Sequence, residues 1–225
     1  ALENDIASTK MKVNCTGVTE LYNEKFHCWK KKGHGLMTMR SAIQRSCDVY
    51  FYEIARRLGV DRLHETAVKF GLGSKILENF LEERSGVVPN TKWKKKFIGQ
   101  NWYLGETLHS GIGQGYFLST PLQLCLMTAQ IANGGWKIRP RLVLKDEDKK
   151  DNLREYIKYK NENPNEPIPT DLLVSSFRLE PLFRNQENIN FVKDAMYAAT
   201  NEPGGTSYGS RLNSKKYQFA GKTGS

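Results

Sequence analysis

Residues 26–52 read FHCWKKKGHGLMTMRSAIQRSCDVYFY, and the interpretation of the whole chain starts from this stretch. It contains two of the four cysteines, two of the four histidines and one short polar triplet, Ser46-Cys47-Asp48. The triplet interrupts an apolar pattern with helical periodicity over residues 38–58. We therefore expect two helical pieces, the second beginning at Ser46 as its N-cap, with Asp48 in its first turn.

The rest of the chain predicts further helices and short strands. Helices are expected at 61–70, 122–133 and 190–199, and strands at 13–18, 136–144 and 217–220. The helix at 122–133 is apolar on nearly every side, so we expect it to be buried, with Ser119 or Thr120 as cap and Pro121 in its first turn. Residues 19–35 are expected to be rich in loops and residues 74–103 to be irregular.

Bulk composition favours one folded domain over residues 1–225. The chain is 39% hydrophobic and 11% aromatic, and it carries a formal net charge of +10. The lysines are scattered and no nucleic-acid-binding motif accompanies them, so we expect solvated surface and no nucleic-acid partner. Residues 145–185 are charged and then rich in proline and asparagine, which predicts a surface insertion. The chain opens without Met and shows no leader, so we expect a fragment whose membrane anchor lies upstream.

A second short motif, Lys222-Thr223-Gly224, follows the last expected strand. Such a triplet offers a cation, a hydroxyl and a glycine that lets a substrate backbone approach closely. Read alone, Ser46 could be only a helix cap, Asp48 a helix-dipole partner and Lys222 a solvated lysine. The segment GIGQG at 111–115 lacks the spacing of a nucleotide-binding loop, so we reject that function.

Six segments together resemble the transpeptidase domain of the penicillin-binding protein 2 family, the class B type that acts in cell elongation. These segments are FHCWKKKGHG, SAIQRSCDVYFYEIARRLG, EERSGVVPNTKWK, GIGQGYFLSTPLQL, IANGGWKIRPRLV and GKTGS. The resemblance implies an α+β fold of the penicillin-binding protein and serine β-lactamase type, an antiparallel sheet flanked by helices. It also implies a D,D-transpeptidase that cross-links peptidoglycan stem peptides and is acylated by β-lactams.

The resemblance assigns roles by motif position. Ser46 is implied to relay protons and, with Lys222, to be catalytic, whereas Asp48, Thr223, Gly224 and Ser225 are implied to bind substrate. The backbone N–H of Ser225 would supply half of an oxyanion hole. The family's nucleophile belongs to an S-x-x-K motif, and no S-x-x-K occurs in residues 1–225. We therefore expect these residues to be inactive alone and the parent protein to be active.

Three thiols and one imidazole form a candidate metal site: Cys15, Cys28, His34 and Cys47. This donor set suits zinc, although the spacing is not that of a zinc finger. A metal could fix the loop-rich region where a core cannot, and it would hold Ser46 from behind. A disulfide or unbound thiols remain open alternatives. Cys125 is expected to be a buried small residue in its apolar helix.

The same resemblance implies the setting of the protein. It would face the periplasm on the inner membrane, and elongation-complex membrane proteins would contact the part that is not in this sequence. The alternative function is a noncatalytic, zinc-stabilised fragment that only binds cell-wall peptide.

Overall fold

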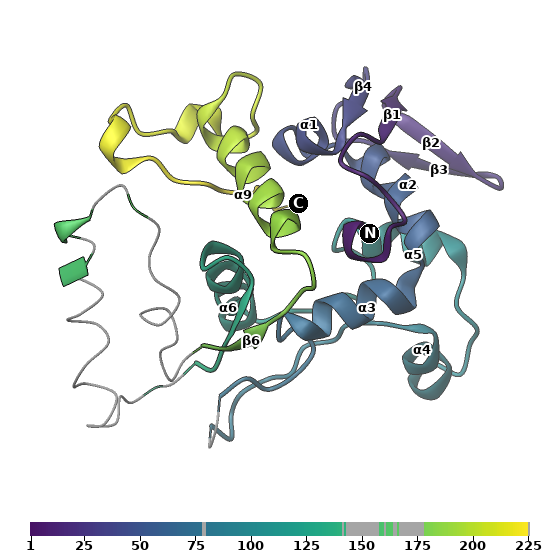
Figure 1. Cartoon of the computed structure of the whole chain (residues 1–225). Helices are drawn as coiled ribbons and strands as arrows, with labels where there is room; N and C mark the ends of the chain where they lie inside the picture. Colours follow the sequence, from purple (N-terminus) through teal and green to yellow (C-terminus); the bar gives the residue numbers. More distant parts are fainter. Residues whose placement is uncertain are drawn as a thin grey trace.

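The computed structural model describes residues 1–77, 80–140, 142, 158–159, 161–163, 166 and 178–224. Along these residues, a group of short strands is followed by a group of helices, and a further strand pair precedes the last helix, which confirms the α+β class (Figure 1). The strands are β1 (Lys12–Cys15), β2 (Val18–Leu21), β3 (Glu24–His27), β4 (Gly35–Thr38), β5 (Trp136–Ile138) and β6 (Arg178–Pro181). The helices are α1 (Met39–Gln44), α2 (Asp48–Leu58), α3 (Val60–Lys69), α4 (Thr91–Phe97), α5 (Leu104–Gly111), α6 (Pro121–Ala132) and α9 (Gln186–Asn201). Short 3-10 turns span Leu2–Asn4, Tyr208–Ser210 and Lys215–Tyr217.

The described strands form three two-stranded antiparallel sheets: β1 with β4, β2 with β3, and β5 with β6. Cys15 lies opposite Gly35 in the β1–β4 register, which brings residues 20 positions apart side by side. Residues 19–35, expected to be rich in loops, therefore contain most of the β2–β3 hairpin. The prediction was wrong here because each strand is only four residues long, too short for a clear alternating pattern.

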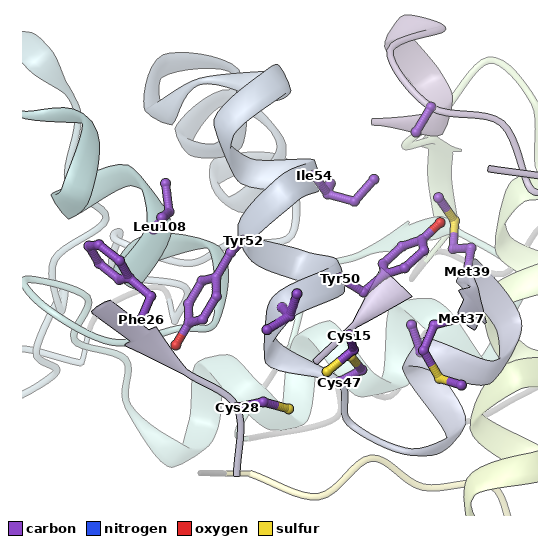
Figure 2. Packing of buried hydrophobic residues seen from close by; sticks show 13 residues of the cluster. Cys15, Phe26, Cys28, Met37, Met39, Cys47, Tyr50, Tyr52, Ile54 and Leu108 are labelled. Atoms are coloured by element: carbon purple, nitrogen blue, oxygen red, sulfur yellow. The ribbon is translucent and has the colours of Figure 1, made fainter. Parts of the chain in front are cut away.

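Helix α2 is the centre of the main core. Tyr50 is fully buried, and Tyr52 and Ile54 are nearly so, on different sides of the helix (Figure 2). Burying side chains of this size stabilises the fold by roughly 1.5–3 kcal/mol each. Against α2 pack α5, through Leu108, and the hairpin, through Phe26. The start of α2 is thereby fixed on several sides.

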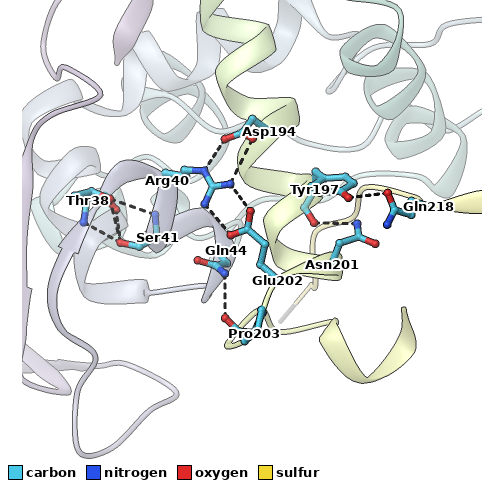
Figure 3. A network of polar contacts seen from close by, with 10 residues as sticks. All are labelled: Thr38, Arg40, Ser41, Gln44, Asp194, Tyr197, Asn201, Glu202, Pro203 and Gln218. Atoms are coloured by element: carbon cyan, nitrogen blue, oxygen red, sulfur yellow. Dashed lines mark hydrogen bonds and ion pairs between the residues drawn. The ribbon is translucent and has the colours of Figure 1, made fainter. Parts of the chain in front are cut away.

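Ion pairs and a hydrogen bond join α1, near the beginning of the chain, to α9, near its end. Arg40 of α1 forms ion pairs with Asp194 of α9 (2.5 Å) and with Glu202, the residue that caps α9 (2.6 Å) (Figure 3). The side-chain amide of Gln44 also donates to the carbonyl of Pro203 at 3.3 Å. These bonds hold α9 along α1, and α9 in turn carries the C-terminal segment.

The N-terminal end of α2 differs from the prediction in one respect. The N-cap residue is Cys47, not Ser46, and its side chain makes no capping hydrogen bond. The first helical piece matches, because Thr38 accepts from the backbone N–H of Ser41 and caps α1. The expected helix at 61–70 corresponds to α3, and the one at 190–199 to a longer α9.

Two other expectations were wrong. Residues 74–103 are not wholly irregular, because α4 forms behind its N-cap Asn90, whose side chain accepts from the N–H of Trp93 at 2.7 Å. Helix α6 is capped by Thr120 as expected, yet it is not buried all round: Leu124 and Cys125 are exposed. Its buried face is instead largely polar. The polar groups there have hydrogen-bond partners: the side-chain amide of Gln123 donates to the carbonyls of Ser74 and Ser85.

The strand expected at 217–220 does not form. Residues 218–224 have no regular structure and pair with no strand among the described residues. They are held by α9 instead: the amide of Asn201 donates to the carbonyl of Phe219 at 2.8 Å, and the N–H of Gly221 donates to the carbonyl of Met196 at 3.1 Å. A strand cannot form without a partner edge, so these extended residues use helix carbonyls and side chains.

Parts of two predictions lie outside the described residues. The strand expected at 136–144 forms as β5 and ends at Ile138, and residues 141 and 143–144 are not described. Most of the surface insertion expected at 145–185 is also not described, and that prediction stays a prediction. Among the described helices, none has the length and apolar character needed to cross a membrane.

Candidate active site and metal centre

Ser46 lies in the tight turn between α1 and α2 in a left-handed backbone conformation, with φ at 52°. This conformation costs a residue other than glycine about 1–2 kcal/mol. It persists because the two helices fix both ends of the turn. The N–H of Cys47 donates to the carbonyl of Ala42 at 2.9 Å, and both of these residues are fully buried. The strain sits on a half-buried serine, a pattern common at functional sites.

The structure brings Lys222 to Ser46. The Nζ atom of Lys222 donates to the Oγ atom of Ser46 at 2.8 Å and to its neighbouring carbonyl, that of Thr223, also at 2.8 Å. Partial desolvation of the amine lowers the pKa of Lys222, and the nearby Asp48 carboxylate raises it part of the way back. The fold therefore joins two motifs that lie 176 positions apart.

Asp48 is buried, and its carboxylate is turned toward the loop after β3. The backbone N–H of Trp29 donates to the Oδ2 atom of Asp48 at 2.9 Å. Asp48 thus fixes that loop and places a negative charge near Lys222. Its predicted contact with substrate stays a prediction.

Of the remaining residues of the C-terminal motif, Thr223 has a hydrogen-bond partner in a neighbouring segment. The hydroxyl of Thr223 is 3.0 Å from that of Thr206, and the N–H of Thr206 donates to the carbonyl of Gln44 at 3.2 Å. Gly224 is exposed, and Ser225 lies outside the described residues. Their predicted substrate-binding roles are untested.

Sequence reasoning missed Thr206 and Trp29. Thr206 joins the C-terminal motif to the end of α1, and its only local signal was the preceding pair Gly204-Gly205. Trp29 contacts Ser46 and Asp48, and only its position beside Cys28 pointed to it.

The four predicted metal ligands form one buried cluster. The ligand atoms of Cys15, Cys28, His34 and Cys47 all lie within 4.8 Å of one another. The Nδ1 atom of His34 is 3.5 Å from the sulfur of Cys28 and 3.7 Å from that of Cys15. Figure 2 shows the three sulfurs converging from β1, the end of β3 and the start of α2. The structure pairs none of the cysteines in a disulfide.

Two glycines let the strands and loops approach closely enough to form this cluster. Gly17 and Gly33 both have positive φ, at 95° and 75°. A Cβ atom on Gly17 would lie 2.2 Å from the carbonyl oxygen of Lys31, and one on Gly33 would lie 2.2 Å from that of Cys15. Only glycine fits at either position. The two glycines therefore allow the backbone segments that carry the cysteines to pack closely.

The chemistry of the cluster fits a metal ion. Burial raises the pKa of the thiols of Cys28 and Cys47 and lowers the pKa of His34, so each group is pushed toward its uncharged form. A neutral imidazole is the form that ligates metals, and a bound cation stabilises thiolates where solvent cannot. The Nε2 atom of His34 is buried without a hydrogen-bond partner among the described residues, while Nδ1 faces the sulfurs. These four residues could therefore hold a metal through Sγ and Nδ1 atoms.

Comparison with known proteins agrees with this geometry. The model of the penicillin-binding protein transpeptidase domain matches residues 1–225. The peptidoglycan D,D-transpeptidase MrdA of Escherichia coli (strain K12) is 33% identical over 202 residues, which cover 89% of this chain and 29% of that protein.

Among the solved structures that are similar over 99% of the chain are two of penicillin-binding protein 2. The crystal structure of Pseudomonas aeruginosa PBP2 in complex with WCK 5153 gives a TM-score of 0.81 at 34% identity, with 46% of that chain covered. The complex between PBP2 and MreC from Helicobacter pylori gives 0.79 at 30% identity, with 37% covered. The chain thus spans less than half the length of each relative, and its sequence and its fold both place it in the penicillin-binding protein transpeptidase domain family.

Proposed function

We propose that these residues form part of a peptidoglycan D,D-transpeptidase that cross-links stem peptides during cell elongation. The observation that carries the proposal is the 2.8 Å hydrogen bond between Lys222 and Ser46. The two motifs that supply them are far apart in sequence, and the fold joins them at a strained serine. The family and its MrdA relatives support the reaction class.

In this proposal the attacking serine and its activating lysine belong to an S-x-x-K motif outside residues 1–225. Ser46 passes a proton between that lysine and the departing amine. The direction of its hydrogen bond suits this role: because Lys222 donates to the Oγ atom, the proton of Ser46 is left to be donated elsewhere. Lys222 and Thr223 orient the substrate carboxylate, and Asp48 keeps the charge near Lys222 balanced. The N–H of Ser225, which lies outside the described residues, would supply half of an oxyanion hole.

A fluorescent penicillin tests the proposal directly. We expect covalent labelling of a longer protein that contains these residues together with an S-x-x-K motif, and no labelling of residues 1–225 alone. Labelling of residues 1–225 alone would show that the nucleophile lies within them. If the longer protein stays unlabelled under conditions where it is folded, it is not a penicillin-binding transpeptidase.

We further propose that the Cys15, Cys28, His34 and Cys47 cluster binds zinc as a structural ion. Three thiolates and one imidazole are a common tetrahedral set for zinc, and all four residues are at most 9% exposed. The ion would tie β1, the 28–34 loop that follows β3 and the N-cap of α2 together directly behind Ser46. Metal analysis of the purified protein should give about one zinc per chain. A value near zero, with all thiols titratable, would leave the cluster as free cysteines.

The setting that fits this function is the periplasmic face of the bacterial inner membrane. Peptidoglycan stem peptides and β-lactams would be the ligands of the site. The Helicobacter pylori neighbour was solved in complex with MreC, which supports elongation-complex proteins as partners of the whole protein. Labelling intact cells with a penicillin that does not enter the cytoplasm would test this location.

A further inference from the structure

One exposed residue, Trp29, makes three hydrogen bonds to the Ser46 turn, two from its side chain and one from its backbone. The indole Nε1–H donates to the backbone carbonyl of Ser46 at 2.8 Å and to that of Arg45 at 3.1 Å. The backbone N–H of Trp29 donates to the carboxylate of Asp48 at 2.9 Å. These bonds reach residues on both sides of Ser46, so the tryptophan spans the turn.

Trp29 is itself held by the buried cysteine and histidine cluster. It follows Cys28 directly, and its ring lies edge-on to the ring of His34, with centroids 5.3 Å apart. The opposite side of the ring is open, because 59% of the residue is exposed to solvent. Burial of the ring therefore does not explain a tryptophan at this position. The two hydrogen bonds from its indole N–H do.

Ser46 needs such an external contact more than its neighbours do. Its backbone is left-handed, its hydroxyl must stay within reach of Lys222, and its own N–H makes only a long bond of 3.3 Å to the carbonyl of Ile43. The carbonyl of Ser46 is fixed by the indole of Trp29. A rotation of the turn would therefore break the bond from Trp29 and, at the same time, move the hydroxyl of Ser46 away from Lys222.

We propose that Trp29 is a positioning residue for Ser46, holding the turn so that the serine hydroxyl points to Lys222 and to the departing amine. The inference rests on the proposed transpeptidase function. Trp29 does not take part in the proton transfer; it sets the place where the transfer occurs. Misplacement of a reacting group by about 1 Å can lower a rate about 100-fold.

The test is Trp29→Phe in the complete penicillin-binding protein. Phenylalanine keeps an aromatic ring and the backbone N–H that binds Asp48, and it removes only the indole N–H. We expect the acylation rate constant for a fluorescent penicillin to fall about 10- to 100-fold, while the constant for noncovalent binding changes by less than about 3-fold. A structural role alone would not produce this separation of the two constants.

The chain offers a matched control in Trp102→Phe. The indole of Trp102 also donates one hydrogen bond of 2.8 Å, to the hydroxyl of Thr107, but it lies on the α4–α5 side of the molecule. We expect this variant to acylate at close to the normal rate. An equal loss in both variants would overturn the proposal, and so would a normal rate in Trp29→Phe.

Hydrogen exchange followed by mass spectrometry provides a readout that does not depend on acylation. In the complete protein, Trp29→Phe should speed amide exchange in a peptide covering residues 43–50, and Trp102→Phe should not. Unchanged exchange in that peptide would overturn the proposal even if the protein proved not to be a transpeptidase. If the unmodified protein fails to acylate while the exchange difference is present, the proposed function fails and the positioning contact stands.

Discussion

The amine of Lys222 donates a hydrogen bond of 2.8 Å to the hydroxyl of Ser46, although 176 positions separate the two residues in the chain. Each partner is held by different structure. Ser46 depends on α1, α2 and Trp29, whereas Lys222 follows residues 218–221, which are bonded to α9. Either residue can therefore be displaced while the other remains in place.

Replacing Ser46 should separate stability from activity. Ser46→Ala and Ser46→Gly both remove the hydroxyl, and we expect each to slow acylation of the complete protein by about 100- to 10,000-fold. Glycine tolerates the left-handed backbone that alanine does not, so the glycine variant should be the more stable by about 1 kcal/mol. Denaturant unfolding and penicillin labelling would measure the two quantities. Equal stability of the variants would contradict the assignment of strain to this residue.

The close packing of the Gly33 backbone against Cys15, beside the cysteine cluster, can be tested by comparing two glycines. Gly33 and Gly35 have nearly the same φ, 75° and 74°, but a Cβ atom on Gly33 would meet the carbonyl of Cys15 at 2.2 Å and one on Gly35 would meet nothing within 4 Å. Gly35→Ala should therefore cost only the conformational strain, about 1–2 kcal/mol. Gly33→Ala should cost at least about 2 kcal/mol more and lower metal content.

Chemical denaturation of both glycine variants, with metal analysis of each, provides the measurement. The prediction fails if the two alanine variants are destabilised to the same extent.

Removal of a metal ligand should lower both metal content and melting temperature. Cys47→Ala leaves an incomplete ligand set behind Ser46, and we expect the variant to hold little zinc. Loss of a bound zinc ion that is present at about 1,000 times its dissociation constant lowers the free energy of unfolding by roughly 4 kcal/mol. For a chain of this size, that loss lowers the melting temperature by about 10 °C. A strong chelator should have the same effect on the unmodified protein.

Cys125→Ala is the control, because this exposed thiol lies in α6, outside the cluster. We expect it to keep its metal and its melting temperature. Unchanged melting of Cys47→Ala would argue against a structural metal.

The link between α1 and α9 should make stability depend on pH. The hydrogen bond from Arg40 lowers the pKa of Glu202 below its usual value. The ion pair therefore contributes above the ordinary glutamate pKa, and this contribution is lost as the pH falls through the lowered pKa. The pair is partly exposed, so Arg40→Met should cost only about 1 kcal/mol at pH 7, and the difference from the unmodified protein should shrink below about pH 4.

Arg56→Met is the matched comparison. Arg56 pairs with Glu53 within α2, three positions away, and it joins no second element. We expect its cost to be about 0.3–0.5 kcal/mol. Unfolding measured between pH 3 and pH 7 would compare the two, and an Arg40→Met effect as small as that of Arg56→Met would contradict the linking role of Arg40.

Much of the site could be predicted from the sequence because its chemistry is concentrated in short motifs. The Ser46 triplet, the C-terminal motif and the three clustered cysteines were all visible as unusual residue types at helix starts and turns. The α1, α3, α6 and α9 helices were visible through periodicity and capping residues such as Thr38 and Thr120.

The missed features depend on contacts between distant parts of the chain. The exposed side of α6 could not be foreseen, because periodicity reports apolar character and not which face is covered. The absent strand at 217–220 depends on whether an edge is available, which no local pattern contains. Trp29 and Thr206 act through hydrogen bonds to residues 17 and 162 positions away, and their neighbours in sequence, Cys28 and Gly204-Gly205, do not reveal those partners.

Helix α9 and its capping residue carry both carboxylates that bind Arg40, and the carbonyl of Met196 that holds Gly221 lies on the same helix. This one helix therefore contacts both halves of the site: α1, which leads to Ser46, and the segment that leads to Lys222. In the proposed enzyme, a substitution that tilts α9 would therefore separate Lys222 from Ser46 while both residues stay folded.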